Sequence, residues 1–156
     1  RYVEVLRDGR LGRLTAIHAT YAADIAAVVN PLGGGAVFDL GCYPASLAQL
    51  TIDALHGESS FAACDVVALG RTGDPRTRNH GTIEETAATL RFASDVTATL
   101  HTAESYGMHS HFEVCGTNGS IRFESNPWLP PAGASRFDRV QLVGPKKAAG
   151  CQEPTK

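Results

Sequence analysis

The sequence predicts an α+β domain in which an open, mainly antiparallel β-sheet carries helices on one face. One helical segment, residues 36–55, is followed by consecutive strand-like runs, which is the pattern of this fold class. The dipeptide Asn118-Gly119 separates two such runs, and this pair is typical of a tight hairpin between antiparallel strands. With 156 residues, 43% of them hydrophobic, the chain has the size of one domain and can bury a core.

The first half of the chain is predicted to contain two helical regions and one strand. Residues 1–7 read as the end of a helix, and Gly9 and Gly12 follow as helix-ending or turn residues. β-Branched and aromatic residues alternate with small ones over residues 13–22, which predicts a strand. Leucines lie along one stripe of residues 36–55. Pro44 interrupts a helical hydrogen-bond ladder, so we expect a short first turn and a new start near Pro44.

The second half is predicted to be almost entirely strand. We expect strands at residues 61–70, 82–92, 95–104, 111–116 and 120–125, with a last possible strand at 138–144. A polar loop with turn chemistry at Asp74-Pro75 follows the first of them. Strands that follow one another without intervening helices favour antiparallel neighbours.

Composition excludes several classes of function. The formal charge is -2 and the sequence holds no basic stripe, so nucleic acid is not the expected partner. No apolar run reaches the roughly 18 residues of a membrane helix. The four cysteines have no C-x-x-C spacing, so we predict free thiols in a reducing, cytoplasmic compartment and no structural zinc. The opening residues look like the middle of a helix without an initiator Met, so we expect a fragment.

Three consecutive glycines, Gly33, Gly34 and Gly35, precede the long helical segment. They are not a dinucleotide-binding fingerprint, because the G-x-G-x-x-G spacing after a strand is absent. One interpretation is a tight loop and nothing more. The other is a bare backbone that lets a ligand or a neighbouring chain segment come close to the start of a helix.

Asp39 and Tyr43 are the candidate pair behind the glycines. Residues four apart lie on the same face of a helix, so both side chains are expected to point the same way. The bland interpretation is a tyrosine hydroxyl that donates to the aspartate. The functional one is proton transfer by the phenol, which requires a nearby cation because a phenol has a pKa of about 10. The lysines, Lys146, Lys147 and Lys156, all lie in the tail, so that cation would come from elsewhere.

Other polar and aromatic residues are weaker candidates. His109 and His111 have strand-like spacing on one face, but no third ligand is evident, so we predict no metal site. The dipeptide Glu84-Glu85 is assigned to a solvated strand edge. Trp128, in a proline-rich loop, could stack on a sugar ring or simply anchor local packing.

Three motifs together resemble a known family. The stretches LRDGRLGRLTAIHA, GGGAVFDLGCYP and EVCGTNGSIRF resemble the C-terminal domain of the glucose–fructose oxidoreductase and inositol dehydrogenase family, called Gfo/Idh/MocA. The resemblance covers about residues 1–130. The DLGCYP motif, with Tyr43 where many members have histidine, is similar to the dihydrodiol dehydrogenase and xylose dehydrogenase branch.

The resemblance implies a function for the chain. Residues 1–156 would be the C-terminal substrate-binding and dimerisation domain of an NAD(P)-dependent oxidoreductase that acts on a sugar, polyol or cyclic diol. In the family an N-terminal Rossmann domain holds NAD or NADP and supplies a lysine from a Glu-Lys-Pro motif. That domain is not in this sequence, and the family's closing helix is missing too, so we expect the fragment alone to be inactive.

The resemblance also implies roles for the candidate residues. Tyr43 would be the catalytic proton-transfer group, and Asp39 would orient the substrate hydroxyl. Gly33, Gly34 and Gly35 would let the nicotinamide approach, and Trp128 would contact substrate. The sheet face commonly forms the subunit contact, and some relatives are periplasmic. The alternative is a non-catalytic self-association domain in which Asp39 and Tyr43 form a structural hydrogen bond.

Overall fold

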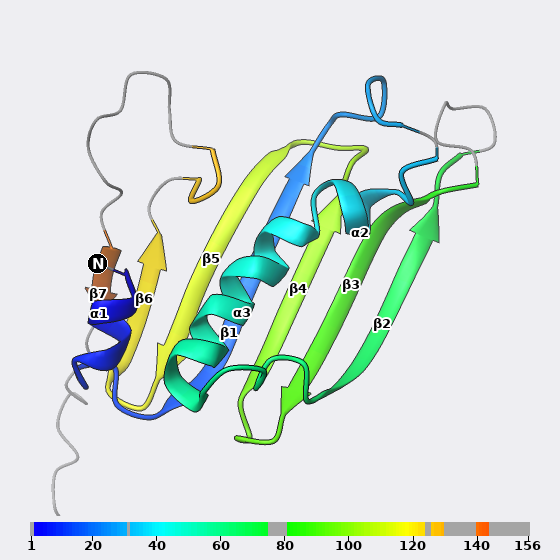
Figure 1. The fold of residues 1–156 in the computed structure, drawn as a ribbon. Helices are drawn as coiled ribbons and strands as arrows, with labels where there is room; N and C mark the ends of the chain where they lie inside the picture. Colours follow the sequence, from blue (N-terminus) through cyan, green and yellow to red (C-terminus); the bar gives the residue numbers. More distant parts are fainter. Residues whose placement is uncertain (1, 31, 75–80, 124–125, 130–139, 144–156) are drawn as a thin grey trace, which may run out of the picture.

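The computed structural model describes residues 2–30, 32–74, 81–123, 126–129 and 140–143, which form a seven-stranded sheet and three helices (Figure 1). In chain order the elements are α1 (Tyr2–Arg7), β1 (Leu14–Ala23), α2 (Ala36–Asp39), α3 (Cys42–His56), β2 (Cys64–Thr72), β3 (Ile83–Phe92), β4 (Thr97–Ala103), β5 (Met108–Gly116), β6 (Gly119–Phe123) and β7 (Val140–Val143). The α+β class is therefore confirmed.

The sheet is open and mainly antiparallel, with the strand order β2-β3-β4-β1-β5-β6-β7. Five neighbouring pairs are antiparallel, and β1 and β4 are parallel. The long connection from β1 to β4 contains α2, α3, β2 and β3. It makes this parallel pair possible, because parallel neighbours need a crossover. Helices α2 and α3 lie on one face of the sheet (Figure 1).

The core lies between α3 and the central strands. Ile52 of α3 packs with Ile17, Phe112 and Val114 of β1 and β5, and all four are fully buried. Burying one such side chain is worth about 1.5–3 kcal/mol. Helix α1 closes one end of the core, where the Tyr2 hydroxyl hydrogen-bonds Thr51 at 2.7 Å. This packing fixes α3, and with it the short helix α2 that precedes it.

The other face of the sheet carries small, polar and a few apolar side chains. Register places Val67, Thr89, Thr99, His18 and Glu113 in one row across five strands. Directly opposed residues share a face, and the neighbouring row of opposite parity is the buried one. We call the face that carries the row from Val67 to Glu113, and not the helices, the open face.

Most predicted elements are confirmed. Residues 36–55 do form an interrupted helix, and Pro44 lies in the first turn of α3. The hairpin at Asn118-Gly119 joins β5 and β6. Strand β5 begins at Met108, three residues earlier than expected. Residues 75–80 of the expected polar loop and Cys151 lie outside the described residues, while the three cysteines that the structure describes are free.

The assignment of Glu84 and Glu85 to a solvated strand edge is wrong. They lie on β3, which is hydrogen-bonded to β2 on one side and β4 on the other. Glu84 is only 8% exposed. The sequence shows that a strand begins there, but the position of that strand in the sheet depends on distant pairing.

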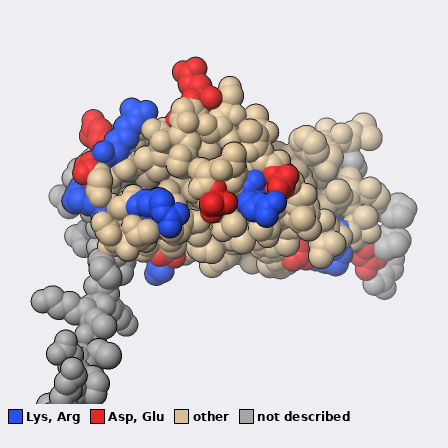
Figure 2. Space-filling view, turned by 90° about the horizontal axis from the view of Figure 1, so that it is seen from below, with Lys and Arg blue, Asp and Glu red and all other residues tan. Residues whose placement is uncertain are grey.

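Charge is mixed over the surface that Figure 2 shows. Basic and acidic side chains are interspersed on this lower end of the molecule, and neither sign gathers into a stripe. Among the described residues, Arg91 and Asp65 are one directly paired example, at 2.8 Å. Among the described helices, none has the length and apolarity needed to cross a membrane.

Candidate functional site

Helix α2 carries Asp39 to the end of the sheet where β1 and β4 finish (Figure 1). The helix starts directly on β3, because a Cβ on Gly35 would lie 2.2 Å from the carbonyl oxygen of Ile83. The φ angle of Gly35 is +80°, a conformation that favours glycine. From the other side the Thr102 hydroxyl donates to the Ala36 carbonyl at 3.2 Å. Two strands therefore hold the helix that presents Asp39.

A sharp corner separates α2 from α3. The Gly41 N–H reaches back to the Ala36 carbonyl at 2.8 Å. A Cβ on Gly41 would lie 2.6 Å from the Val37 carbonyl oxygen, so a side chain here would open the corner. Asp39 is thus the last residue of α2 and Tyr43 the second residue of α3. They flank a turn of the backbone and do not share one continuous helix.

Tyr43 is held on one side by a buried tyrosine and stays accessible on another. Its ring centroid lies 5.4 Å from that of Tyr21, with the planes at 90°. This edge-to-face geometry is a favourable one for aromatic pairs. Tyr21 is buried, whereas Tyr43 is 38% exposed. Tyr43 is therefore anchored and reachable from solvent, as a proton-transfer group must be.

The hydrogen bond between Tyr43 and Asp39 that the structural alternative requires is not formed among the described residues. Asp39 Oδ2 is buried and receives no hydrogen from a described N–H or hydroxyl group. The group that hydrogen-bonds the Asp39 carboxyl is instead another carboxyl, that of Glu104. The geometry therefore does not support a structural hydrogen bond between Tyr43 and Asp39.

Glu104 is a site residue that sequence reasoning missed. It directly follows β4 and is fully buried. Its backbone is fixed by two hydrogen bonds, from its N–H to the Glu84 carbonyl and from the Ile25 N–H to its own carbonyl, both at 3.0 Å. Burial, and then the negative charges of Asp39 and Glu84, raise the pKa of Glu104 to about 7. A hydrogen bond with the Asp39 carboxyl contributes to the raised pKa as well.

Strand parity was the signal that could have revealed Glu104. Side chains alternate between the two faces of a strand, and Ala98 and Thr102 of β4 are both buried. Glu104 lies two residues beyond Thr102, on the same face. An acidic residue at a position predicted to face the core is unusual unless it has a partner.

The glycine loop lies beside Asp39. A Cβ on Gly33 would come 3.4 Å from Asp39 Oδ1, and one on Gly34 would lie 2.6 Å from the Phe38 ring. The Gly33 N–H donates to the Asn30 carbonyl at 2.8 Å, which closes the loop. Bare backbone thus borders the carboxylate at Gly33, whereas Gly35 serves the contact with β3.

Trp128 lies one aromatic ring away from Tyr43. Its ring centroid is 5.0 Å from that of Tyr21 and 6.4 Å from that of Phe112. The side-chain oxygen of Asn126 accepts a hydrogen bond from the backbone N–H of Trp128 at 2.9 Å and shapes the local turn. The indole Nε1 is buried with no partner among the described groups. These contacts describe a packing anchor, and contact with substrate stays a prediction.

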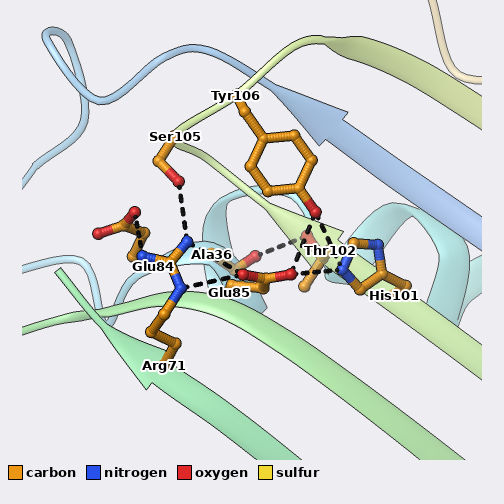
Figure 3. Close-up of polar contacts among 8 residues, drawn as sticks. All are labelled: Ala36, Arg71, Glu84, Glu85, His101, Thr102, Ser105 and Tyr106. Carbon is orange, nitrogen blue, oxygen red and sulfur yellow. Dashed lines mark hydrogen bonds and ion pairs between the residues drawn. The ribbon is translucent and has the colours of Figure 1, made fainter.

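A second polar cluster lies on β2, β3 and β4 (Figure 3). Arg71 bonds Glu84 at 2.8 Å and Glu85 at 3.0 Å. Glu85 also accepts from the Tyr106 hydroxyl at 3.1 Å and lies 3.0 Å from His101 Nε2. The contacts with His101 and then Arg71 lower the pKa of Glu85. The guanidinium of Arg71 is therefore paired with the carboxylates of Glu84 and Glu85.

The histidine pair on β5 shows strand geometry. His109 and His111 pair with Ala22 and Thr20 of β1 and share the open face. His111 Nε2 lies 3.6 Å from Glu113. Within the ranges that the structure describes, no group of three His, Cys, Asp or Glu side chains is placed to hold a metal ion.

Comparison with known proteins places this chain in one family. Residues 1–122 match the GFO/IDH/MocA C-terminal domain. An uncharacterized oxidoreductase, ORF334 of Rhizobium meliloti, is 30% identical over 158 residues, which cover 96% of this chain and 42% of that protein. Trans-1,2-dihydrobenzene-1,2-diol dehydrogenase of Xenopus tropicalis is 26% identical over 130 residues, 81% of this chain and 36% of that protein. The chain thus spans less than half the length of these relatives.

A solved structure shows the same fold. KijD10, a 3-ketoreductase from Actinomadura kijaniata in complex with TDP-benzene and NADP, superimposes with a TM-score of 0.65 at 22% identity, covering 92% of this chain and 43% of KijD10. The chain belongs to the GFO/IDH/MocA oxidoreductase family and corresponds to its C-terminal domain.

Proposed function

We propose that this chain is the substrate-binding and catalytic-tyrosine domain of an NAD(P)-dependent oxidoreductase that acts on a sugar, polyol or cyclic diol. The observation that carries the proposal is the placement of Tyr43. Its ring is anchored on Tyr21 and 38% exposed, at a corner that also presents Asp39 and bare glycine backbone. The related diol dehydrogenase of Xenopus tropicalis supports a hydroxylated substrate.

Tyr43 is the proton-transfer group in this proposal. In the oxidation direction the substrate O–H proton passes to the ionised phenolate oxygen of Tyr43 as the carbon–oxygen bond becomes a carbonyl, and in reduction the neutral phenol returns the proton. A nicotinamide cofactor, held mainly by a separate domain and bordered here by Gly33 and Gly34, would supply the hydride chemistry at that carbon. Asp39 orients the substrate hydroxyl or the tyrosine and its cation. Proton transfer from a positioned side chain contributes roughly 10²–10⁴-fold in rate.

The proposal requires a cation close to Tyr43. Positive charge favours the ionised form of a phenol. The described residues include no lysine, and Arg71 is occupied by Glu84 and Glu85. We therefore assign the cation to a lysine of a separate cofactor-binding Rossmann domain in the full-length protein. This chain alone is expected to be inactive.

The glycine loop fits a nicotinamide cofactor. Any side chain at Gly33 would approach Asp39 Oδ1, and one at Gly34 would strike Phe38, so the loop leaves its backbone bare next to the carboxylate. Gly33 and Gly34 are the members of the triplet proposed to border substrate and cofactor, since the contact of Gly35 with Ile83 explains that position. KijD10 binds NADP, and our proposal covers NAD as well as NADP.

A turnover screen of the full-length protein tests the proposal. We expect reduction of NAD or NADP with at least one pyranose, acyclic polyol or cyclic diol. Absence of turnover with every member of such a panel, for a protein that binds the cofactor, would contradict it.

The free thiols of Cys42, Cys64 and Cys115 support our assignment to the cytoplasm.

A second function, self-association through the open face, has its own support. Val67 and Leu69 of β2 are 73% and 79% exposed. They border a hollow of about 360 Å³ that is also lined by small and polar residues of β1, β3 and β4. Exposed apolar side chains grouped around a hollow mark an interaction surface. We propose that a second copy of the chain covers this face and forms a homo-oligomer.

A further inference from the structure

Strand β2 forms one border of the sheet, and its outer edge is open to a further strand. Among the described strands, β3 alone is hydrogen-bonded to β2, and Figure 1 shows β2 at the end of the sheet. Every residue of β2 after Cys64 is exposed, so the strand is accessible from both of its faces. The N–H and C=O groups of such an edge can bind another strand.

The composition of β2 does little to protect this edge. Natural sheets blunt exposed edges with short strands, charged side chains, proline or bulges. Strand β2 is nine residues long, against about five or six in a typical strand. It contains no proline, and its register shift lies at its end, between Arg71 and Thr72. Residues 66–70, VVALG, carry no charge, so the middle of the edge can accept a strand.

The two charged residues of β2 make the strand complementary to a second copy of itself. Asp65 lies three residues before Ala68, and Arg71 lies three residues after it. When two copies run antiparallel with a two-fold axis at Ala68, Asp65 of each copy is opposite Arg71 of the other. Val67 of each copy is then opposite Leu69 of the other. Opposite charges and apolar side chains at directly opposed positions both stabilise antiparallel strands.

The same charges select one register. Moving the axis by one residue in either direction places Val67 opposite Arg71, or Asp65 opposite Leu69, so that charges face apolar side chains. Register in a sheet is specified by such pairings. Of these three registers, the one centred on Ala68 alone pairs both charges and both large apolar side chains.

Both charged side chains can take a partner from a second copy. Asp65 bonds Arg91, and Arg71 bonds Glu84 and Glu85, but the side chains of Asp65 and Arg71 are each more than half exposed. A carboxylate and a guanidinium each have room for several hydrogen bonds. The contact between copies therefore adds to the ion pairs within each chain and does not require that they break.

We propose that two copies of this chain pair edge to edge through β2, antiparallel about Ala68, so that their sheets join into one continuous sheet. The contact is made by main-chain groups at the border of the sheet, and it is separate from the open face. It does not depend on the proposed catalytic role of Tyr43. A two-fold axis uses the same edge on both copies, so this contact closes as a pair and does not extend into a filament.

A cysteine in place of Ala68 tests the pairing in the full-length protein. Directly opposed residues of antiparallel strands have Cα atoms about 4.5–5.5 Å apart, a separation that a disulfide can span. The four cysteines of this chain are first replaced by serine. Ala68→Cys should then form a disulfide between copies on mild oxidation, seen by non-reducing electrophoresis and located by mass spectrometry of tryptic peptides.

Val66→Cys is the matched control, since it lies on the same strand and the same face as Ala68. In the proposed register the two copies of residue 66 lie about 13 Å apart along the sheet, too far for a disulfide. Both positions point away from the open face, because side chains alternate along a strand and Val67 lies on that face. A dimer formed through the open face alone therefore leaves both variants uncrosslinked.

The crosslinking result decides the inference. A disulfide in Ala68→Cys that is at least about tenfold faster than in Val66→Cys supports the edge pairing. No disulfide in Ala68→Cys, or equal rates in the two variants, overturns it. The first of these results is also expected if another protein or another domain covers β2. Neither result depends on turnover or on the open face, so the proposed functions are tested separately.

The charge pair is tested in the same Ala68→Cys protein. Asp65→Lys places a cation opposite Arg71 of the second copy, and like charges opposed in this way repel. We expect disulfide formation to slow at least about tenfold. Arg91→Ala is the control, because it also removes the ion pair between Arg91 and Asp65 within the chain but keeps the contact between copies. Equal rates in Asp65→Lys and Arg91→Ala would overturn the proposed register.

Discussion

The ring of Tyr43 meets the ring of Tyr21 edge to face, with centroids 5.4 Å apart and planes at 90°. Tyr21 lies near the end of β1 and is buried, and its other side packs on Trp128 at 5.0 Å. The exposed phenol is thus supported by a stack of aromatic rings that reaches the core. This support limits the positions that Tyr43 can occupy at the helix corner.

Removing the Tyr21 ring should loosen Tyr43. Tyr21→Ala is expected to lower the free energy of unfolding by about 3–5 kcal/mol, the cost of deleting a buried aromatic ring. It should also reduce turnover of the full-length protein. Tyr21→Phe keeps the ring contact and should cost less than about 1.5 kcal/mol. Urea unfolding of both variants checks this, and equal losses would show that the ring contact does not matter.

The contact between Gly35 and β3 predicts a strong effect of a single methyl group. Gly35→Ala places a Cβ against the Ile83 carbonyl at a left-handed φ of +80°. Gly81 has a similar φ of +85° but nothing within 4 Å of a Cβ, so Gly81→Ala isolates the cost of the backbone conformation, about 1–2 kcal/mol.

Denaturant unfolding of these two glycine variants makes the comparison. Gly35→Ala should be less stable than Gly81→Ala by at least about 1 kcal/mol, because overpacking adds to the conformational cost. Equal stability of the two variants would contradict the claim that α2 starts directly on the β3 backbone.

The raised pKa of Glu104 predicts how stability changes with pH. Below about pH 4.5 the carboxyl is protonated in both folded and unfolded chains. Between about pH 4.5 and 7 the unfolded chain releases this proton while the folded chain keeps it. The contribution to the free energy of unfolding therefore decreases as the pH rises, by about 3 kcal/mol in total.

Comparison with Glu104→Gln isolates that contribution. The lowered pKa of His111, caused mainly by burial, acts in the opposite direction near pH 6, and it is common to both proteins. The difference in unfolding free energy between wild type and Glu104→Gln should change by about 3 kcal/mol between pH 4 and 8. A difference that is constant with pH would refute the raised pKa of Glu104.

If two copies of the chain associate through the open face, one charge introduced there should weaken the dimer. Val67→Lys places a cation among the apolar side chains proposed to face a second copy, so the dimer should dissociate at least about tenfold more readily. Val66→Lys changes the neighbouring residue of the same strand, which is 57% exposed and points to the opposite face. Sedimentation velocity should show loss of the dimer in the first variant only. A wild-type monomer at all concentrations would contradict the proposal.

Local signals explain why the elements could be predicted from sequence. The alternation of residues 13–22, the new helix start near Pro44 and the Asn118-Gly119 turn each depend on a few neighbouring residues, and the structure confirms all three. The parallel pairing of β1 with β4 could not be predicted in this way, because the two strands are separated by both helices and two other strands.

The errors at the site have the same physical origin. Glu84 was assigned to an edge because nothing near it in sequence shows that β2 and β4 flank its strand. Glu104 was missed because its partner, Asp39, is 65 residues earlier in the chain. The spacing of Asp39 and Tyr43 predicted that they share one helix face, but the corner at Gly41 that separates them follows from a close backbone contact.

Turnover of Tyr43→Phe in the full-length protein, measured with the cofactor and a substrate found by the screen, is the most direct test of the central claim. The matched control is Tyr106→Phe, since Tyr106 is also exposed, 42% against 38% for Tyr43, but lies in the Glu85 cluster. Loss of the Tyr43 hydroxyl should lower kcat by roughly 10²–10⁴-fold with unchanged unfolding, while Tyr106→Phe retains wild-type turnover. Equal turnover in wild type and Tyr43→Phe would contradict the assignment of Tyr43 as the proton-transfer group.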